Sequence, residues 1–146
     1  MRSMMLMSKA DKHTQAGTSH RAMNIALWIL QVVLAALFLA HGWFMVAPPA
    51  EMVAMINANI GPEFRIFIGV AEVLAAVGLI APGVTRILPW LTAWAAAGLM
   101  IVMGSATIFH VFRGETGSAI TTAVLFGLVT VVACMRWKVT PSTPHK

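Results

Sequence analysis

Four long runs of apolar residues, separated by short polar segments, set the pattern of the chain. The runs cover residues 24–46, 64–81, 88–112 and 119–136. Each has about 18 to 25 residues, and a helix of that length crosses the ~30 Å hydrocarbon layer of a bilayer. None of the runs shows the polar face that a helix of a soluble bundle would have. The pattern therefore predicts an all-α integral membrane protein with four spans.

The segments outside the runs complete the predicted organisation. Residues 1–22 and 139–146 are polar and without periodicity, so we expect two disordered tails around a membrane domain over residues 23–138. The first connection, residues 47–61, begins at a Pro-Pro pair, contains several apolar residues and ends at Gly61. This composition predicts a short amphipathic helix in the first outer loop.

Composition supports the membrane interpretation. Of the 146 residues, 59% are hydrophobic and 10% charged, whereas a soluble domain has about a quarter charged residues. The first run resembles the apolar core of a signal peptide, but it continues as far as Met45 and is therefore interpreted as a span. Cys134 is the single cysteine, which excludes an intramolecular disulfide.

The basic residues predict the orientation. Eight of the ten Lys and Arg flank the spans on the side of the two termini, and Arg65 and Arg113 lie on the other side. The positive-inside rule then places both termini in the cytoplasm, as expected for a multi-pass protein of the bacterial inner membrane. The basic fringe suits anionic lipid headgroups. Because it forms no patch with exposed aromatic residues, a nucleic-acid partner is not expected.

Glu72 stands near the middle of the second run, where an unpaired carboxylate costs about 2.5–3.5 kcal/mol. On a helix Arg65, Gly69, Glu72 and Ala76 share one face, so this face should point into the bundle. Arg65 is close enough to lean toward the acid. Polar groups on this face either join the helices to one another or line an outward-facing pocket that binds a polar headgroup or carries protons.

The candidate site residues follow from this second alternative. Glu72 is the candidate catalytic proton acceptor or donor, and His41, Arg65, His110 and Arg113 are the candidate ligand-binding residues. No metal site is expected, since the two histidines lie at different depths and no second pair exists for a haem. Small residues in the last two spans, among them Gly98, Gly104 and Gly127, are expected at close helix contacts.

Three segments, "AHGWFMV", "FRIFIGVAEVLAAVGLIAPGVTR" and "SATIFHVFRGE", together resemble the DoxX-like family of small bacterial membrane proteins. The second segment carries most of the likeness, in the order G-x-x-E-x-x-x-x-x-G-L-x-x-P-x-x-x-R. The resemblance implies a four-helix membrane bundle and an association with thiosulfate:quinone oxidoreductase and with membrane redox complexes. The chain departs from the family at Trp43, where many members have a lysine after the glycine of the first span.

The resemblance and the polar face together favour one function, a subunit or accessory of a quinone-linked redox assembly with a pocket around Glu72. A transporter or permease subunit is the alternative, and four spans would then need to dimerise. A non-catalytic membrane scaffold is the third. Whether the chain is an enzyme stays open. The expected partners are lipids, a quinone and other redox subunits, a homo-oligomer stays open, and no intrinsic cofactor is expected.

Overall fold

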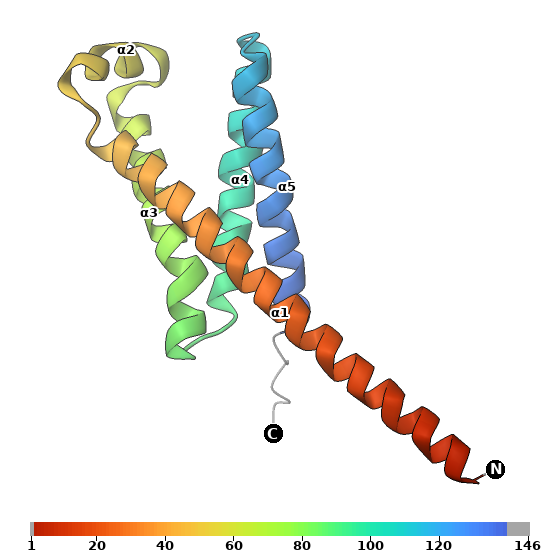
Figure 1. Cartoon of the computed structure of the whole chain (residues 1–146). Coiled ribbons are helices and arrows are strands. Elements are labelled where there is room, and N and C mark those ends of the chain that lie inside the picture. The colour runs from red at the N-terminus through yellow and green to blue at the C-terminus, as the bar shows by residue number, and fades with distance from the viewer. Residues whose placement is uncertain (1, 140–146) are drawn as a thin grey trace, which may run out of the picture. The chain divides into compact units, whose positions relative to one another are not determined.

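The computed structural model describes the backbone of residues 2–139 and the side chains of residues 21–138. This part of the chain is helical and has no strand (Figure 1). Its helices are α1 (Arg2–Val46), α2 (Ala50–Ile60), α3 (Pro62–Thr85), α4 (Leu91–Phe112) and α5 (Thr116–Val139). The chain divides into two compact units, Met1–Leu30 and Gln31–Lys146, and the packing below concerns the second unit alone.

Four helical stretches are long and apolar enough to cross a membrane. They are Arg21–Val46, Pro62–Thr85, Leu91–Phe112 and Thr116–Lys138. The four predicted spans are therefore confirmed. Their ends shift by up to a few residues because each helix continues until a breaker stops it, as α3 does between Gly61, with a positive φ of 78°, and the turn at Arg86.

Helix α1 begins well before the predicted span. The structure continues it back to Arg2, where a disordered tail over residues 1–22 was expected. Residues 2–46 contain no proline and are rich in the good helix formers Ala, Leu and Met, so nothing in this stretch forces the helix to end. The other expected tail, over residues 139–146, lies outside the described residues beyond Val139.

One close helix crossing in the second unit joins α1 to α3. A Cβ atom added at Gly42 would lie 2.8 Å from the carbonyl oxygen of Gly69, and one added at Gly69 would lie 2.7 Å from that of Gly42. Side chains are thus excluded from this crossing, and the two backbones touch. A second close contact joins α3 to α4, where a Cβ at Gly78 would lie 2.7 Å from the Cβ of Ala95.

Not every glycine of the spans packs in this way. Gly104 faces the ring of Phe126, whereas Gly98 and Gly127 have no atom within 4 Å of an added Cβ. The expectation of close contacts at Gly98 and Gly127 is therefore wrong. The core of the second unit contains fully buried aliphatic residues, among them Leu34, Leu79, Leu99, Val129 and Val132.

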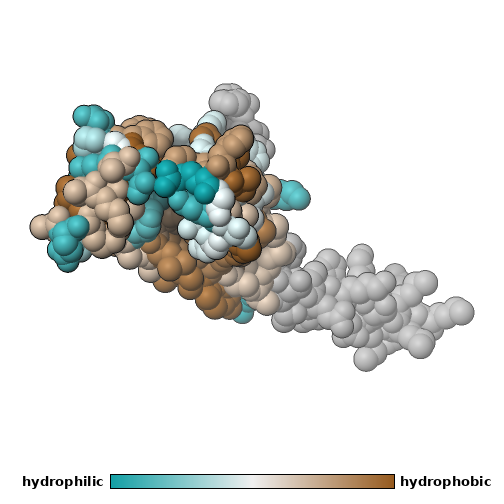
Figure 2. All heavy atoms as spheres, turned by 90° about the horizontal axis from the view of Figure 1, so that it is seen from above, coloured by the Kyte–Doolittle hydropathy of each residue, from teal (hydrophilic) through white to brown (hydrophobic). Residues whose placement is uncertain are grey.

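The outward faces of the spans are apolar. Leu74, Ile101 and Phe112 are among many large hydrophobic residues that lie exposed, as expected for helices that face lipid tails. Hydrophilic side chains lie at the end of the second unit that carries α2 and the α4–α5 turn (Figure 2). The predicted short helix of the first loop is α2, and it lies at this end (Figure 1).

Candidate functional site

Glu72 is fully buried and is paired with one residue of another helix. Its Oε2 lies 2.6 Å from Nδ1 of His41, which comes from α1. Its other oxygen, Oε1, has no hydrogen-bond partner among the described residues. The His41 side chain is 53% exposed, so one nitrogen of the imidazole meets the buried acid while the rest of the ring lies at the surface of the bundle. We call these two residues the dyad.

The predicted polar face of α3 explains why Glu72 is inside. The buried residues of α3 include Arg65, Gly69, Glu72 and Ala76, which confirms the face predicted from their spacing. The Gly42–Gly69 crossing then brings α1 so close to this face that a Cβ atom added at Gly42 would lie 3.0 Å from Cβ of Glu72. His41 directly precedes Gly42, so the crossing brings the imidazole within hydrogen-bond distance of Glu72.

Arg65 has a different partner from the one expected. Its Nε donates to Oδ1 of Asn57 at 2.9 Å, and its Nη1 donates to the main-chain carbonyl oxygens of Met45 and Val46. These carbonyls end α1, where a helix carries a partial negative charge, so a buried guanidinium is stabilised there without a carboxylate. Arg65 therefore caps α1 and is hydrogen-bonded away from Glu72.

His110 and Arg113 belong to a second cluster at the α4–α5 turn. Nδ1 of His110 lies 2.6 Å from Oε2 of Glu115, and Nε of Arg113 donates to Oε1 of Glu115 at 2.6 Å. Arg113 also stands 5.3 Å above the centre of the Phe109 ring. The five candidate residues thus form two groups and a helix cap rather than a single lined pocket, and Glu115, which was not a candidate, is central to the second group.

Helix α2 connects the Arg65 cap to the cluster at the α4–α5 turn. Its Asn57 accepts from Arg65 on α3, and its Asn59 accepts from Nη2 of Arg113 at 2.9 Å. Two asparagines two residues apart therefore bind arginines that are 48 positions apart in the chain. The sequence signal for this role was present in the two asparagines near the end of a largely apolar helix, but spacing alone could not say which arginines they would meet.

Glu115 should titrate at unusually low pH. The hydrogen bond from Arg113, and then the one from His110, hold the pKa of Glu115 below its ordinary value. Because the folded-state pKa is lowered, the carboxylate stabilises the turn fully above the ordinary glutamate pKa, and this contribution is lost as the pH falls through the lowered pKa. A ¹³C carboxyl titration by NMR measures it, and Arg113→Gln should raise the midpoint. An unchanged midpoint in Arg113→Gln would contradict this assignment.

A third polar contact joins the opposite half of the bundle. Gln31 of α1 is buried, donates from Nε2 to the carbonyl oxygen of Leu79 at 2.6 Å, and accepts at Oε1 from Nε of Arg136 at 2.6 Å. One amide therefore ties α1 to both α3 and α5. Arg136 was expected in the basic fringe at the end of the fourth run, and its hydrogen bond to a buried amide of α1 was not foreseen.

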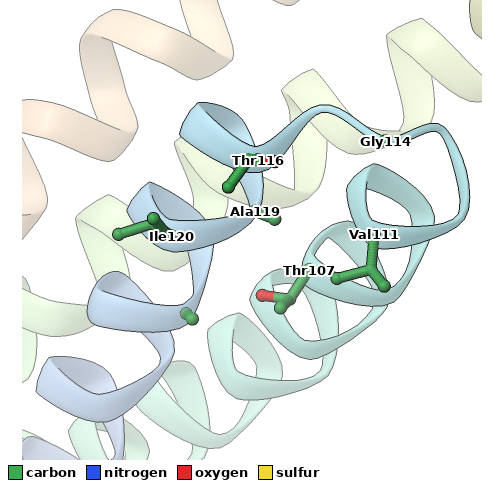
Figure 3. A pocket seen from close by; sticks show the side chains of 7 residues that line it. Thr107, Val111, Gly114, Thr116, Ala119 and Ile120 are labelled. Carbon is green, nitrogen blue, oxygen red and sulfur yellow. The ribbon is translucent and has the colours of Figure 1, made fainter.

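Two of the grooves on the described part of the surface lie between neighbouring helices. One, of about 350 Å³, lies between α4 and α5 beside the turn and is drawn in Figure 3. Thr107 lines this groove, and its hydroxyl group points toward α5, where Oγ1 of Thr107 lies 2.9 Å from Oγ1 of Thr122. The other, of about 460 Å³, lies between α1 and α3. Glu72 lines neither groove.

These features define the class of the protein, a multi-pass membrane protein whose four apolar helices enclose polar contacts. The family can now be given as well: the model of the DoxX-like family matches residues 29–133, and the chain belongs to that family. The matched part contains the dyad, the Arg65 cap and the cluster at the turn. No curated protein and no solved structure matches the chain.

Proposed function

We propose that the chain delivers protons to a membrane quinone, as a subunit of a redox assembly whose partner supplies the electrons. The observation that supports this is the dyad: a buried carboxylate, one of whose oxygens has no hydrogen-bond partner in the described part of the chain, paired with an imidazole that reaches the lipid-facing surface. Reduction of a quinone to a quinol takes up two electrons and two protons. A proton donor at bilayer depth is therefore a group that this reaction requires.

The roles within the dyad follow from its geometry. Nε2 of His41 makes no hydrogen bond within the described residues, so it can meet a quinone oxygen that approaches laterally from the bilayer. A protonated Glu72 can pass its proton to the bare Nδ1 of neutral His41, which leaves an imidazolium beside a carboxylate that stabilises it. The imidazolium then gives its Nε2 proton to the quinone oxygen. The second proton of the quinol requires that the dyad takes up another proton from water, through the exposed edge of the imidazole, before the next transfer. Both termini are placed in the cytoplasm in this proposal, from the distribution of Lys and Arg, within a bacterial inner membrane.

Binding of ubiquinone-1 to the full chain in lipid nanodiscs tests the proposal. We expect the wild type to bind it and His41→Gln to weaken binding about tenfold, the effect of one lost charge-assisted hydrogen bond. His110→Gln is the matched control, because His110 belongs to the turn cluster, and it should bind as the wild type does.

Two results would overturn the proposal. One is a wild type that does not bind the quinone. The other is a His41→Gln variant that melts at a lower temperature yet binds the quinone normally, since the dyad would then only join α1 to α3. Circular dichroism melts of each variant separate loss of fold from loss of the quinone contact.

A further inference from the structure

The groove between α1 and α3 is apolar along most of its length and polar at one end. On α1 it is lined by Ala35, Ala36 and Leu39. On α3 its lining runs from Ala76 to Thr85. These ten residues of helix extend over about 13.5 Å, close to half of the ~30 Å hydrocarbon thickness and thus to one leaflet. Its small residues leave room for a chain of methylene groups that lies along the bundle.

The groove ends beside an arginine that is held in an unfavourable conformation. Arg86 follows Thr85 directly, is exposed, and has a positive φ of 59°, a conformation that favours glycine. Arg86 is also the single charged residue between Glu72 and Arg113 in the sequence. The α3–α4 hairpin therefore offers no carboxylate to pair with it.

The surrounding charges favour an anion at this end. The second unit has Arg86, Arg136 and Lys138 at the end of the bundle where α3 and α5 finish (Figure 1). Its described acidic residues are elsewhere, in α2, in the first half of α3 and at the α4–α5 turn. Each Lys or Arg near a membrane surface strengthens the attraction to anionic lipids.

We propose that this groove binds one acyl chain of an anionic phospholipid, whose phosphate is held at Arg86, in the leaflet that contains the α3–α4 turn. The site is separate from the dyad. Ala36 and His41 are five residues apart on α1, which places them about 140° apart around the helix, so the exposed imidazole and the groove lie on different faces. The proposal therefore stands whether or not the chain binds a quinone.

Electron paramagnetic resonance with lipids spin-labelled on one acyl chain tests it. The full chain is reconstituted with labelled phosphatidylglycerol or labelled phosphatidylcholine, and the immobilised fraction of label is measured. We expect the wild type to prefer phosphatidylglycerol about fivefold, the effect of one cation at the surface. Arg86→Gln should remove the preference and Arg86→Lys should keep it. Ala36→Phe, which fills the groove from an exposed position, should remove the specifically immobilised component of both lipids.

Val131→Phe is the control for Ala36→Phe, because Val131 is exposed on α5 and lines neither groove. The proposal is overturned if the wild type shows no preference, if Arg86→Gln keeps it, or if Ala36→Phe and Val131→Phe immobilise equal fractions. It is also overturned if ubiquinone-10 displaces the label, which would make the groove a site for the quinone tail. A dimer that Ala36→Phe dissociates would equally overturn it, since a second copy would then fill the groove.

Discussion

Replacing His41 by alanine is expected to lower the free energy of unfolding by about 3–5 kcal/mol. The substitution leaves a fully buried Glu72 without its one hydrogen-bond partner, and Oε1 has none to compensate among the described residues. An uncompensated charge inside a bundle costs far more than the pair contributes when both partners are present. Reversible unfolding in mixed micelles, followed by circular dichroism, measures the change.

A double-mutant cycle separates the buried charge from lost packing. Glu72→Gln removes the charge and keeps the shape, so His41→Ala should cost only about 1 kcal/mol in that background. The difference between the two costs is the coupling within the dyad. Equal costs of His41→Ala in the two backgrounds would show that the imidazole acts by packing alone, and the proton-transfer role would lose its physical basis.

The spans and the buried face of α3 could be predicted because both follow from local periodicity. Run length decides whether a helix crosses the bilayer, and spacings of four, three and four residues place Arg65, Gly69, Glu72 and Ala76 on one side of α3 whatever the rest of the chain does. The burial of Glu72 was likewise predictable, because a carboxylate among apolar residues has few stable positions except the interior.

The pairing of the polar residues could not be predicted in the same way. Arg65 was expected beside Glu72 from their common face, yet the carbonyl end of α1 and Asn57 lie nearer to its guanidinium. That choice depends on where one helix ends against another, which no spacing within α3 encodes. Glu115 was passed over for a related reason: it lies in a turn outside the spans, and its importance comes from the two partners around it.

The glycines of the helices likewise could be located from the sequence, but their contacts with neighbouring helices could not be predicted from it. Gly42, Gly69, Gly98 and Gly127 are all within helices, and all look alike in the sequence, but only the first two lie where backbones touch. Whether a glycine is required depends on the neighbouring helix. Alanine substitutions at Gly69 and at the two open positions therefore test whether α1 and α3 cross where the dyad forms.

Gly69→Ala is expected to destabilise the bundle by about 1–3 kcal/mol, although alanine is the better helix former by about 0.8–1 kcal/mol. The added methyl group would lie 2.7 Å from the carbonyl oxygen of Gly42 and 2.9 Å from Cβ of Met45. The main-chain carbonyl of Gly42 cannot rotate away as a flexible side chain could, so α1 must shift away from α3. That shift also lengthens the contact of His41 with Glu72, and ubiquinone-1 binding should weaken with it.

Gly98→Ala and Gly127→Ala are the matched controls, since nothing lies within 4 Å of a Cβ at either position. There the helix preference acts alone, and the same substitution should raise the free energy of unfolding by up to about 1 kcal/mol. The decisive result is thus a difference of sign, measured by unfolding in mixed micelles. If Gly69→Ala is as stable as the two controls, α1 and α3 do not cross at these glycines, and the crossing cannot be what brings His41 to a carboxylate inside the bundle.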